Sequence, residues 1–586
     1  MVLNLKKFFL SKDTSETVEH LKELVRPCAQ SAEKVIGDVA TLKGDADVGK
    51  DVYSDLELLV SYNGDGDSSV TANIDHTVLS GSHLFLKELL VNPVSDASLL
   101  KRRQDVIRGF DRPSASKTIK ELAAYEESML WIYNNAETSE ELSTLYNMVF
   151  FNNVLTRPLN RRAEVLTGYN LYRIVGSPLI GIFSPIVYFV IPYLIVRIKL
   201  KLPMSFTSYL MMMFKGIFSS KSMLLSSFPK LGFLSTAFSL LFYFQGIFNS
   251  VEVARAAYQI SSFITKKMND VMQYVNLAED LSTNHWNPEM KDAFFIAETA
   301  YECRGQFAKI STSPKFSLFS NFGTKLSHYK YFEKKEYVTL LRRTYIIDTI
   351  SSINKLQFCY PTFLDGGVPK VVVEGVWHPS LKKPVKNTFT IEKSLLITGP
   401  NAGGKSTLIK STLLAILFAQ TLGVANADAM TLTPFYYVNS QMNIPDCKGK
   451  ESLFEAEMYR SKANLDKLKE LDGKLSILFM DEIFNSTNPV EGISGAYAIA
   501  KNMASHPSNL AVITTHYLYL TKLATNFPDR FVNMKMNVIQ KDDDIKYPYK
   551  VSKGISRQYI ALELLKKNGF DKDVVDDALA IKAKLT

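Results

Sequence analysis

The residues with the most specific chemistry in this sequence form the stretch GPNAGGKST, residues 399–407. Four of them occupy the fixed positions of the pattern G-x-x-x-x-G-K-[ST]: Gly399, Gly404, Lys405 and Ser406. In such a turn, backbone N–H groups surround phosphate oxygens, and the N-terminus of the next helix adds a positive dipole. The lysine reaches the β- and γ-phosphates, and the serine hydroxyl binds Mg²⁺. We therefore predict a site for ATP and Mg²⁺ formed by Gly399, Pro400, Asn401, Ala402, Gly403, Gly404, Lys405, Ser406 and Thr407.

Two carboxylates follow an apolar run farther along the chain, where residues 474–482 read KLSILFMDE. Asp481 lies at the end of the run and can hold Mg²⁺ through the water molecules around the ion. Ser406 can bind the ion directly. Glu482 can orient or deprotonate the attacking water. An isolated pair of this kind would be an ordinary start of a loop. Downstream of a phosphate-binding loop, it predicts the metal ligand and the catalytic base.

Two further side chains are candidates for the same site. His516 follows the apolar run 510–515, LAVITT, and could contact the γ-phosphate, so we include it with the catalytic residues. Ser452 opens a predicted helix, where a serine usually serves only as an N-cap. The positive end of that helix could equally bind a phosphate held by a second subunit.

The elements around these residues indicate an α/β fold. A short apolar run at 395–398 precedes the glycine-rich loop, and an apolar-periodic stretch follows it through Gln420, which is the order strand, loop, helix. Residues 371–376 read as a strand that enters the same domain. This order argues against a chance match of the pattern in a glycine turn. The sequence therefore predicts an α/β P-loop ATPase domain at the C-terminus, preceded by a mainly α-helical domain.

The overall composition is that of a folded protein with several domains. The chain has 586 residues, 46% hydrophobic and 22% charged, which is too long for one core. A net charge of +9 permits anionic partners but is mild for this length. The four cysteines are scattered, without metal-ligand spacing, so a disulfide framework is not expected.

Two long uncharged runs, residues 174–196 and 231–249, favour a hydrophobic hairpin. The first would span about 34 Å as a helix, enough for a bilayer core of about 30 Å. We therefore expect a transmembrane or re-entrant pair in contact with lipid, in a membrane-associated protein whose ATPase domain faces the cytosol. The basic loop between the runs conflicts with a simple two-span topology. Two buried core helices are the alternative.

Several motifs together resemble the ATPase domain of the MutS family of DNA mismatch repair proteins. They are TGPNAGGKST at 398–407, S-x-F-x-x-E-M at 452–458, LFMDEI at 478–483 and TTHY at 514–517. His378-Pro379 and Asn387 match family positions ahead of the loop, and residues 75–110 and 549–578 resemble the family's helical core and dimerising segment. The resemblance implies an ABC-type ATPase in which a homodimer encloses two nucleotides. Ser452 of one subunit would then reach the nucleotide of the other.

The sequence also departs from that family. After Ile483 the family usually has Gly-Arg-Gly-Thr, whereas this chain has Phe484, Asn485, Ser486 and Thr487. No Phe-x-Glu motif occurs before residue 75, so the mismatch-recognition domain is expected to be missing, and a membrane segment would replace the family's DNA clamp. Binding of DNA stays open. The candidate phosphate contacts are Arg161, Arg162, Lys266, Lys267, Arg342 and Arg343.

These observations predict five segments. They are a leader at 1–74, a helical core at 75–170, the hydrophobic pair at 171–250, a helical return at 251–365 and the ATPase domain with C-terminal dimerisation helices at 366–586. The predicted function is ATP hydrolysis coupled to movement of helical arms. A repair-related role of these arms on DNA is one interpretation. The alternative is a mechanochemical or scaffold ATPase at a membrane, with no role on DNA.

Overall fold

The structure is a computed structural model, and it divides the chain into two compact units. It describes residues 44–62, 64, 66, 68–135, 148–185, 189–218, 229–294, 320–332, 335–442, 453–541, 544–556 and 570–585. The first unit comprises the described parts of Glu121–Glu279 and Ala300–Leu340. The second comprises the described parts of Ile36–Lys120, Asp280–Thr299 and Leu341–Thr586.

A seven-stranded sheet forms the centre of the second unit. Its strands, in spatial order, are β1 (Asp47–Val48), β7 (Tyr437–Gln441), β8 (Ser476–Asp481), β9 (Asn509–Thr515), β5 (Ser394–Thr398), β10 (Phe531–Met536) and β13 (Val551–Lys553). All neighbours pair in parallel except β10 and β13. The central strands β5 and β9 are buried along their whole length, as expected for parallel strands covered on both faces.

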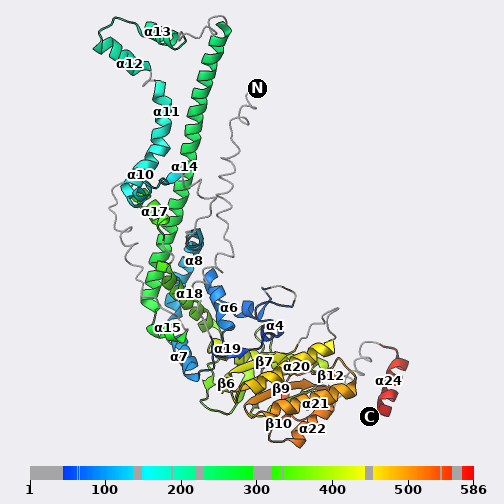
Figure 1. Cartoon of the computed structure of the whole chain (residues 1–586). Helices are drawn as coiled ribbons and strands as arrows, with labels where there is room; N and C mark the ends of the chain where they lie inside the picture. The colour runs from blue at the N-terminus through cyan, green and yellow to red at the C-terminus, as the bar shows by residue number, and fades with distance from the viewer. Residues whose placement is uncertain are drawn as a thin grey trace. The chain divides into compact units, whose positions relative to one another are not determined.

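Helices cover both faces of this sheet (Figure 1). Helix α19 (Lys405–Thr421) lies on one side, and helices α21 (Pro489–Ser505) and α22 (Lys522–Asn526) lie on the other. Helix α20 (Leu453–Glu470) shares a buried apolar cluster with α21 that includes Leu468, Met480 and Ala500. The predicted α/β fold of the C-terminal domain is thereby confirmed.

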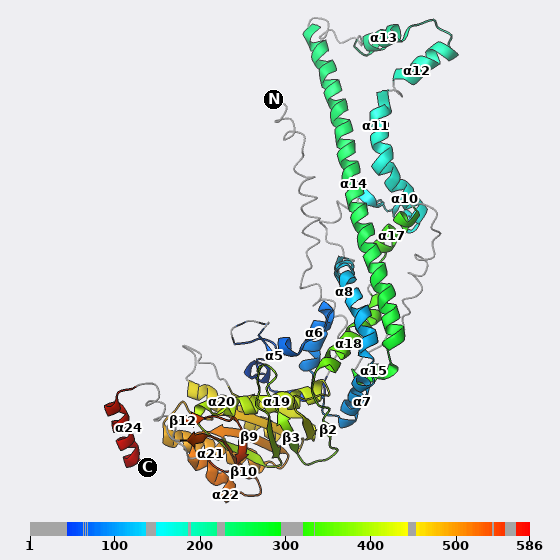
Figure 2. The same ribbon diagram turned by 180° about the vertical axis from the view of Figure 1, so that it is seen from behind.

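The remaining strands form two smaller sheets, and further helices complete the second unit (Figure 2). The four-stranded sheet has the order β2 (Thr362–Phe363), β6 (Ala429–Leu432), β3 (Val371–Val376) and β4 (Asn387–Ile391), and β11 (Ile539–Lys541) pairs with β12 (Asp544–Lys546). Besides α19 to α22, the α-helices described wholly within this unit are α4 (Val52–Asp55), α5 (Val70–Ile74), α6 (Ser80–Leu90), α7 (Ala97–Arg108), α15 (Pro288–Ala293) and α24 (Lys572–Leu585).

The first unit is helical. Its elements are η1 (Arg157–Arg161), α10 (Ala163–Leu171), η2 (Tyr172–Gly176), α11 (Ser177–Pro185), α12 (Ile191–Leu194), η4 (Ile195–Lys199), α13 (Phe206–Phe218) and α17 (Ser320–Lys330). Three helices pass from one unit to the other: α8 (Arg112–Asn135), α14 (Pro229–His285) and α18 (Lys335–Lys355). Helices α10 and α17 approach closely because Gly323 has no side chain, and its N–H donates to Thr167 Oγ1 at 3.1 Å. The ring of Trp131 stacks on Tyr329, 5.6 Å between centroids.

The two uncharged runs do not form the predicted membrane hairpin. The run 174–196 is divided among η2, α11, α12 and η4, and residues 186–188 lie outside the described ranges. The run 231–249 is part of α14, which continues for 57 residues in all. No helix within the described ranges is long and apolar enough to cross a membrane. The predicted membrane location with a cytosol-facing ATPase domain is therefore wrong, and the lipid contact is withdrawn with it.

Candidate functional site

The glycine-rich loop joins the end of β5 to the start of α19. Asn401–Gly403 form a single 3-10 turn, closed by a hydrogen bond from Gly403 N to Pro400 O at 2.9 Å. Gly404 then takes a left-handed conformation, φ +86°, directly before the first residue of α19. A Cβ at this position would lie 3.0 Å from the ring of Tyr549. Backbone conformation and packing both require glycine here.

The Lys405 side chain is buried at the end of this loop, with 2% of its surface exposed. Its Nζ donates to the carbonyl oxygens of Gly399 at 2.9 Å and Pro400 at 3.3 Å. The same nitrogen lies 3.3 Å from Glu482 Oε1 and 3.1 Å from His516 Nε2. Burial lowers the pKa of Lys405, and the Glu482 carboxylate opposes this only in part. The structure therefore brings together three predicted site residues that are far apart in the sequence.

Glu482 follows the last residue of β8 and has an unusual backbone, φ +52°. Its N–H donates to both the carbonyl and the hydroxyl oxygen of Thr514, each at 3.2 Å. One carboxylate oxygen contacts His516 and Lys405, and the other accepts a hydrogen bond from Asn485 Nδ2 at 2.7 Å. Burial raises the pKa of Glu482, but the hydrogen bond and charge of His516, together with Lys405, outweigh it and leave the pKa below its ordinary value. The carboxylate is thus held ionised.

His516 directly follows the last residue of β9, and 32% of its side-chain surface is exposed. Its Nε2 faces both Lys405 Nζ and Glu482 Oε1. One ring nitrogen cannot accept from the ammonium and donate to the carboxylate at once, so the tautomer selects the partner. The histidine is therefore placed to exchange partners when an anionic group enters between the three side chains.

Asp481 and Ser406 supply the oxygen atoms suited to Mg²⁺. Asp481 is the last residue of β8, pairs in register with Thr514 and accepts a hydrogen bond from the Thr514 hydroxyl. Ser406 lies in the first turn of α19 and is exposed. Carboxylate and hydroxyl oxygens are the ligands that Mg²⁺ prefers, with phosphate oxygens and water completing the shell. These two residues fit the ion that the loop chemistry implies.

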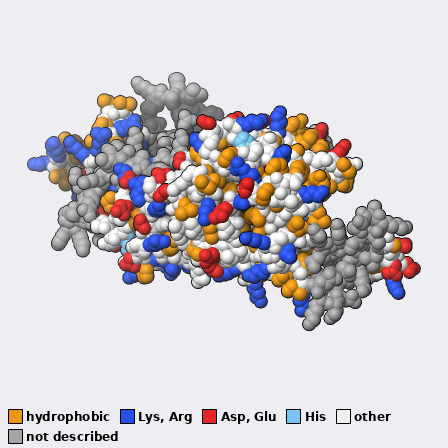
Figure 3. Space-filling view, turned by 90° about the horizontal axis from the view of Figure 1, so that it is seen from below, with side chains coloured by type: hydrophobic (Ala, Val, Ile, Leu, Met, Phe, Trp, Pro, Cys, Tyr) orange, Lys and Arg blue, Asp and Glu red, His pale blue; other side chains and the backbone are white. Residues whose placement is uncertain are grey.

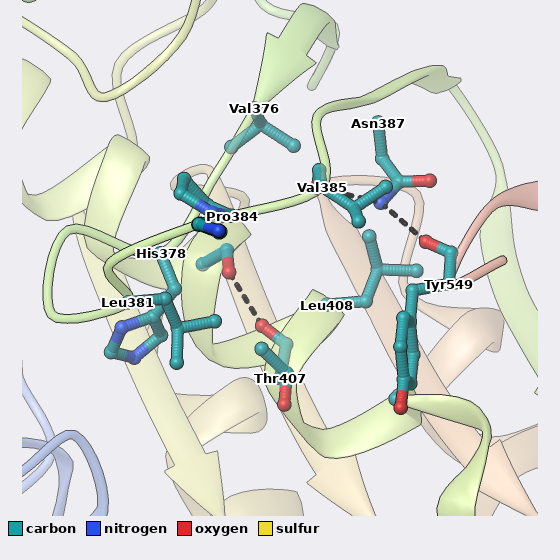
Figure 4. A pocket seen from close by; sticks show the side chains of 12 residues that line it. Val376, His378, Leu381, Pro384, Val385, Asn387, Thr407, Leu408 and Tyr549 are labelled. Carbon is teal, nitrogen blue, oxygen red and sulfur yellow. Dashed lines mark hydrogen bonds between the residues drawn. The ribbon is translucent and has the colours of Figure 1, made fainter. Parts of the chain in front are cut away.

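A pocket of about 290 Å³ opens beside the loop. Its lining residues are Val376, His378, Leu381, Lys383, Pro384, Val385, Asn387, Gly404, Thr407, Leu408, Ser411 and Tyr549. Figure 4 shows Val385, Leu408 and Tyr549 around one part of this space, with His378 and Leu381 at another. Asn387 fixes the Tyr549 segment, because its Nδ2 donates to Tyr549 O at 3.0 Å and its Oδ1 accepts from Val551 N at 2.9 Å.

The sequence motifs did not predict this pocket beside the loop. His378 and Asn387 were noted only as matches to family positions, and Tyr549 only as part of the C-terminal segment. One signal could have indicated the pocket: all three residues belong to segments that resemble the same family as the glycine-rich loop, although they lie outside that loop. Ser452, the predicted second-subunit contact, lies outside the described residues, so its place relative to the loop is not defined.

The C-terminal part of the chain is similar to known proteins. Residues 395–586 match the family described as MutS domain V. Over 295 residues the chain is 27% identical to the DNA mismatch repair protein Msh3 of Dictyostelium discoideum. That alignment covers 46% of this chain and 19% of the relative, so the chain matches about a fifth of the relative's length. The C-terminal α/β domain is thus similar to MutS domain V, and the likeness to Msh3 supports the MutS family.

Proposed function

We propose that the chain binds ATP with Mg²⁺ at the loop 399–407 and hydrolyses it. The observation that carries this proposal is the direct contact of Lys405 with both Glu482 and His516, at 3.3 and 3.1 Å. Glu482 and His516 directly follow β8 and β9, and Lys405 begins α19 after the loop that leaves β5, which pairs with β9. An ammonium, a carboxylate and an imidazole that meet at a phosphate-binding loop are the groups that phosphoryl transfer to water needs.

Each group has a defined part in binding. The backbone N–H groups of the loop and the Lys405 ammonium receive the phosphates. Ser406 and Asp481 hold Mg²⁺, which neutralises charge on the β- and γ-phosphate oxygens when bound. The pocket beside the loop takes the base and sugar, since the Tyr549 ring and the aliphatic side chains of Val385 and Leu408 offer a flat apolar surface.

Glu482 acts on the attacking water. The water oxygen forms a bond to the γ-phosphorus while the bond from that phosphorus to the bridging oxygen breaks, and ADP leaves with the electron pair. The water proton passes to the Glu482 carboxylate, whose low pKa keeps it ionised before the reaction. His516 contacts the γ-phosphate and reports its presence, because the same ring nitrogen also faces Lys405 and Glu482.

The proposal extends to a homodimer that works on DNA in a repair-related role. Ser452 of one subunit would reach the nucleotide of the other, as the resemblance to the MutS family implies. Support for a DNA role comes from the likeness to Msh3, which is named a DNA mismatch repair protein. Movement of the helical first unit would then follow the nucleotide state.

The basic side chains available for DNA are fewer than the sequence suggested. Lys267 is buried and pairs with Glu127 at 2.9 Å, and Arg342 is buried as well. Arg161, Arg162 and Lys266 are exposed and remain candidates for phosphate contacts. Basic and acidic side chains are mixed on the face shown in Figure 3. An ATPase without a DNA role is therefore the second candidate.

Phosphate release by the purified chain tests both candidates. The rate is measured with Mg²⁺ alone, with a plain duplex and with a mismatched duplex, at low salt and at about 200 mM salt, because phosphate contacts weaken steeply with salt. We expect Mg²⁺-dependent hydrolysis in every case and a change of rate with both duplexes, since the mismatch-recognition domain is expected to be missing. Hydrolysis that ignores both duplexes, with no DNA binding at low salt, would leave the ATPase and refute the DNA role.

A further inference from the structure

The Glu482 carboxylate is contacted on both of its oxygen atoms. Oε1 lies 3.3 Å from Lys405 Nζ and also contacts His516 Nε2. Oε2 accepts a hydrogen bond from Asn485 Nδ2 at 2.7 Å. Asn485 lies in the turn 483–486, at the position where the MutS family usually has arginine. The turn thus supplies a neutral donor to the carboxylate that we assign as the base.

This turn is anchored at both ends. At its start, the Glu482 N–H donates to the carbonyl and to the hydroxyl oxygen of Thr514, each at 3.2 Å. At its end, Asn488 caps α21, because its Oδ1 accepts a hydrogen bond from Val490 N at 3.0 Å. Asn485 therefore projects from a short segment whose two ends are held by β9 and α21.

The middle of the turn is fixed by Phe484. This residue has a left-handed backbone, φ +61°, and its carbonyl oxygen accepts a hydrogen bond from the Tyr517 hydroxyl at 2.9 Å. Its buried ring packs edge-on against Phe454, 5.4 Å between centroids. A Cβ would lie 2.5 Å from its carbonyl oxygen at Gly492 and 2.9 Å from its ring at Gly495, so both positions need glycine. The residue directly before Asn485 is therefore held in one arrangement.

The two oxygens of Glu482 differ in how their partners respond to a nucleotide. Both partners of Oε1, Lys405 and His516, are the side chains that we assign to the phosphates. A bound γ-phosphate draws them away and leaves Oε1 free to accept a proton from water. Asn485 belongs to the turn and not to the phosphate-binding loop, so its bond to Oε2 does not depend on the phosphate. It is then the donor that still fixes the plane of the carboxylate.

We propose that Asn485 is a positioning residue for Glu482, which holds Oε2 so that Oε1 points to the attacking water. This inference rests on the proposed ATPase function. Asn485 does not take part in the transfer itself: the water proton passes to Oε1 of Glu482. Its contribution is orientation, and the loss of orientation at a reacting group slows the reaction without weakening the binding of substrate.

The test compares Asn485→Ala and Asn485→Asp with Asn284→Ala as the matched control. Asn284 is likewise exposed and donates through Nδ2 to a carboxylate oxygen, that of Asp280 at 3.0 Å, but it lies on α14. Isothermal titration gives the dissociation constant for ATP with Mg²⁺, and phosphate release gives kcat. The same Asn485→Ala change is also made in the Glu482→Gln background, where single-turnover phosphate release is measured.

We expect Asn485→Ala to lower kcat roughly 10-fold, the lower end for a hydrogen bond to a charged group, because Asn485 is exposed. ATP affinity should stay within about twofold. Asn485→Asp keeps the shape of the side chain but replaces the donor by a second carboxylate, which repels the first, so its loss of kcat should be larger. In the Glu482→Gln background, Asn485→Ala should change the rate less than about twofold. Asn284→Ala should match the wild type.

Three outcomes would overturn the inference. The first is wild-type kcat in Asn485→Ala. The second is a loss of ATP affinity as large as the loss of kcat, and the third is an equal loss of rate in the Glu482→Gln background, which would show that Asn485 does not act through Glu482. These failures appear only in variants of an active chain. A wild-type chain that releases no phosphate refutes the proposed function itself, and this inference with it.

Discussion

Replacing Lys405 with methionine removes the one charge at the end of the loop while keeping the volume of its buried stem. A hydrogen bond to a charged group contributes about 1.5–3 kcal/mol, which corresponds to about a 10- to 150-fold change in affinity. The lower part of this range applies here. In the structure Lys405 already pairs with Glu482 at 3.3 Å, so a phosphate replaces one anionic partner by another. We expect ATP to bind Lys405→Met about 10- to 30-fold more weakly.

Isothermal titration with ATP and Mg²⁺ measures this change. Lys393→Met is the matched control, because Lys393 is exposed and donates only to the Pro528 carbonyl, at 2.9 Å, among the hydrogen bonds described. The variant should not unfold more readily, since burial already lowers the pKa of Lys405 and thus disfavours its charge. Affinity within twofold of the wild type, with the control also unchanged, would refute the assignment of Lys405 to the phosphates.

Three further changes probe the rest of the site. Glu482→Gln should leave ATP binding intact and lower kcat about 10²- to 10⁴-fold, the usual contribution of a general base; rapid turnover in a phosphate-release assay would exclude that role. His516→Ala removes the side chain that lowers the pKa of Glu482 most and leaves Lys405 in place, so that pKa rises and the acid limb of the kcat–pH profile should move to higher pH; an unmoved limb would contradict the pairing. Gly404→Ala forces φ +86° on a residue with a Cβ 3.0 Å from Tyr549 and should lower stability to urea by about 1–2 kcal/mol; unchanged stability would show that the loop adopts another conformation.

The contact between Glu482 and His516 also determines how stability changes with pH. The pKa of Glu482 is lower in the folded chain than its ordinary value. Its ionised form therefore contributes stability that is present above the unfolded pKa and is lost as the pH falls through the folded pKa. His516→Ala should reduce this contribution near neutral pH, and a comparison of urea unfolding at pH 7 and in mild acid would measure it.

The parts of the site that lie close together in the sequence could be predicted from it. In the loop 399–407 and in the pair Asp481-Glu482, the residues of each motif are adjacent in the sequence. The apolar runs before them identify the strands. The contact between Lys405 and His516, 111 positions apart, could not be derived in this way. It depends on β5 and β9 being neighbours in the sheet, and hydrophobic patterns do not specify strand order.

Two other features needed the structure for different reasons. The pocket beside the loop combines Asn387 and Tyr549 through a hydrogen bond between segments 162 positions apart, and neither residue type alone signals a nucleotide. The membrane prediction failed because it counted uncharged residues without regard to the helices in which they lie. The first run is divided among η2, α11, α12 and η4, and the second run continues into the rest of α14, which carries charged residues such as Glu252.

Hydrolysis of ATP in water enriched in ¹⁸O tests the central claim most directly. If the loop, Lys405 and Glu482 direct water to the γ-phosphorus, one ¹⁸O atom should enter each inorganic phosphate released by the purified chain with Mg²⁺, and ADP should contain none. Mass spectrometry of both products measures this. Release of no phosphate above the level of a Lys405→Met, Glu482→Gln double variant, or label in ADP, would contradict the account.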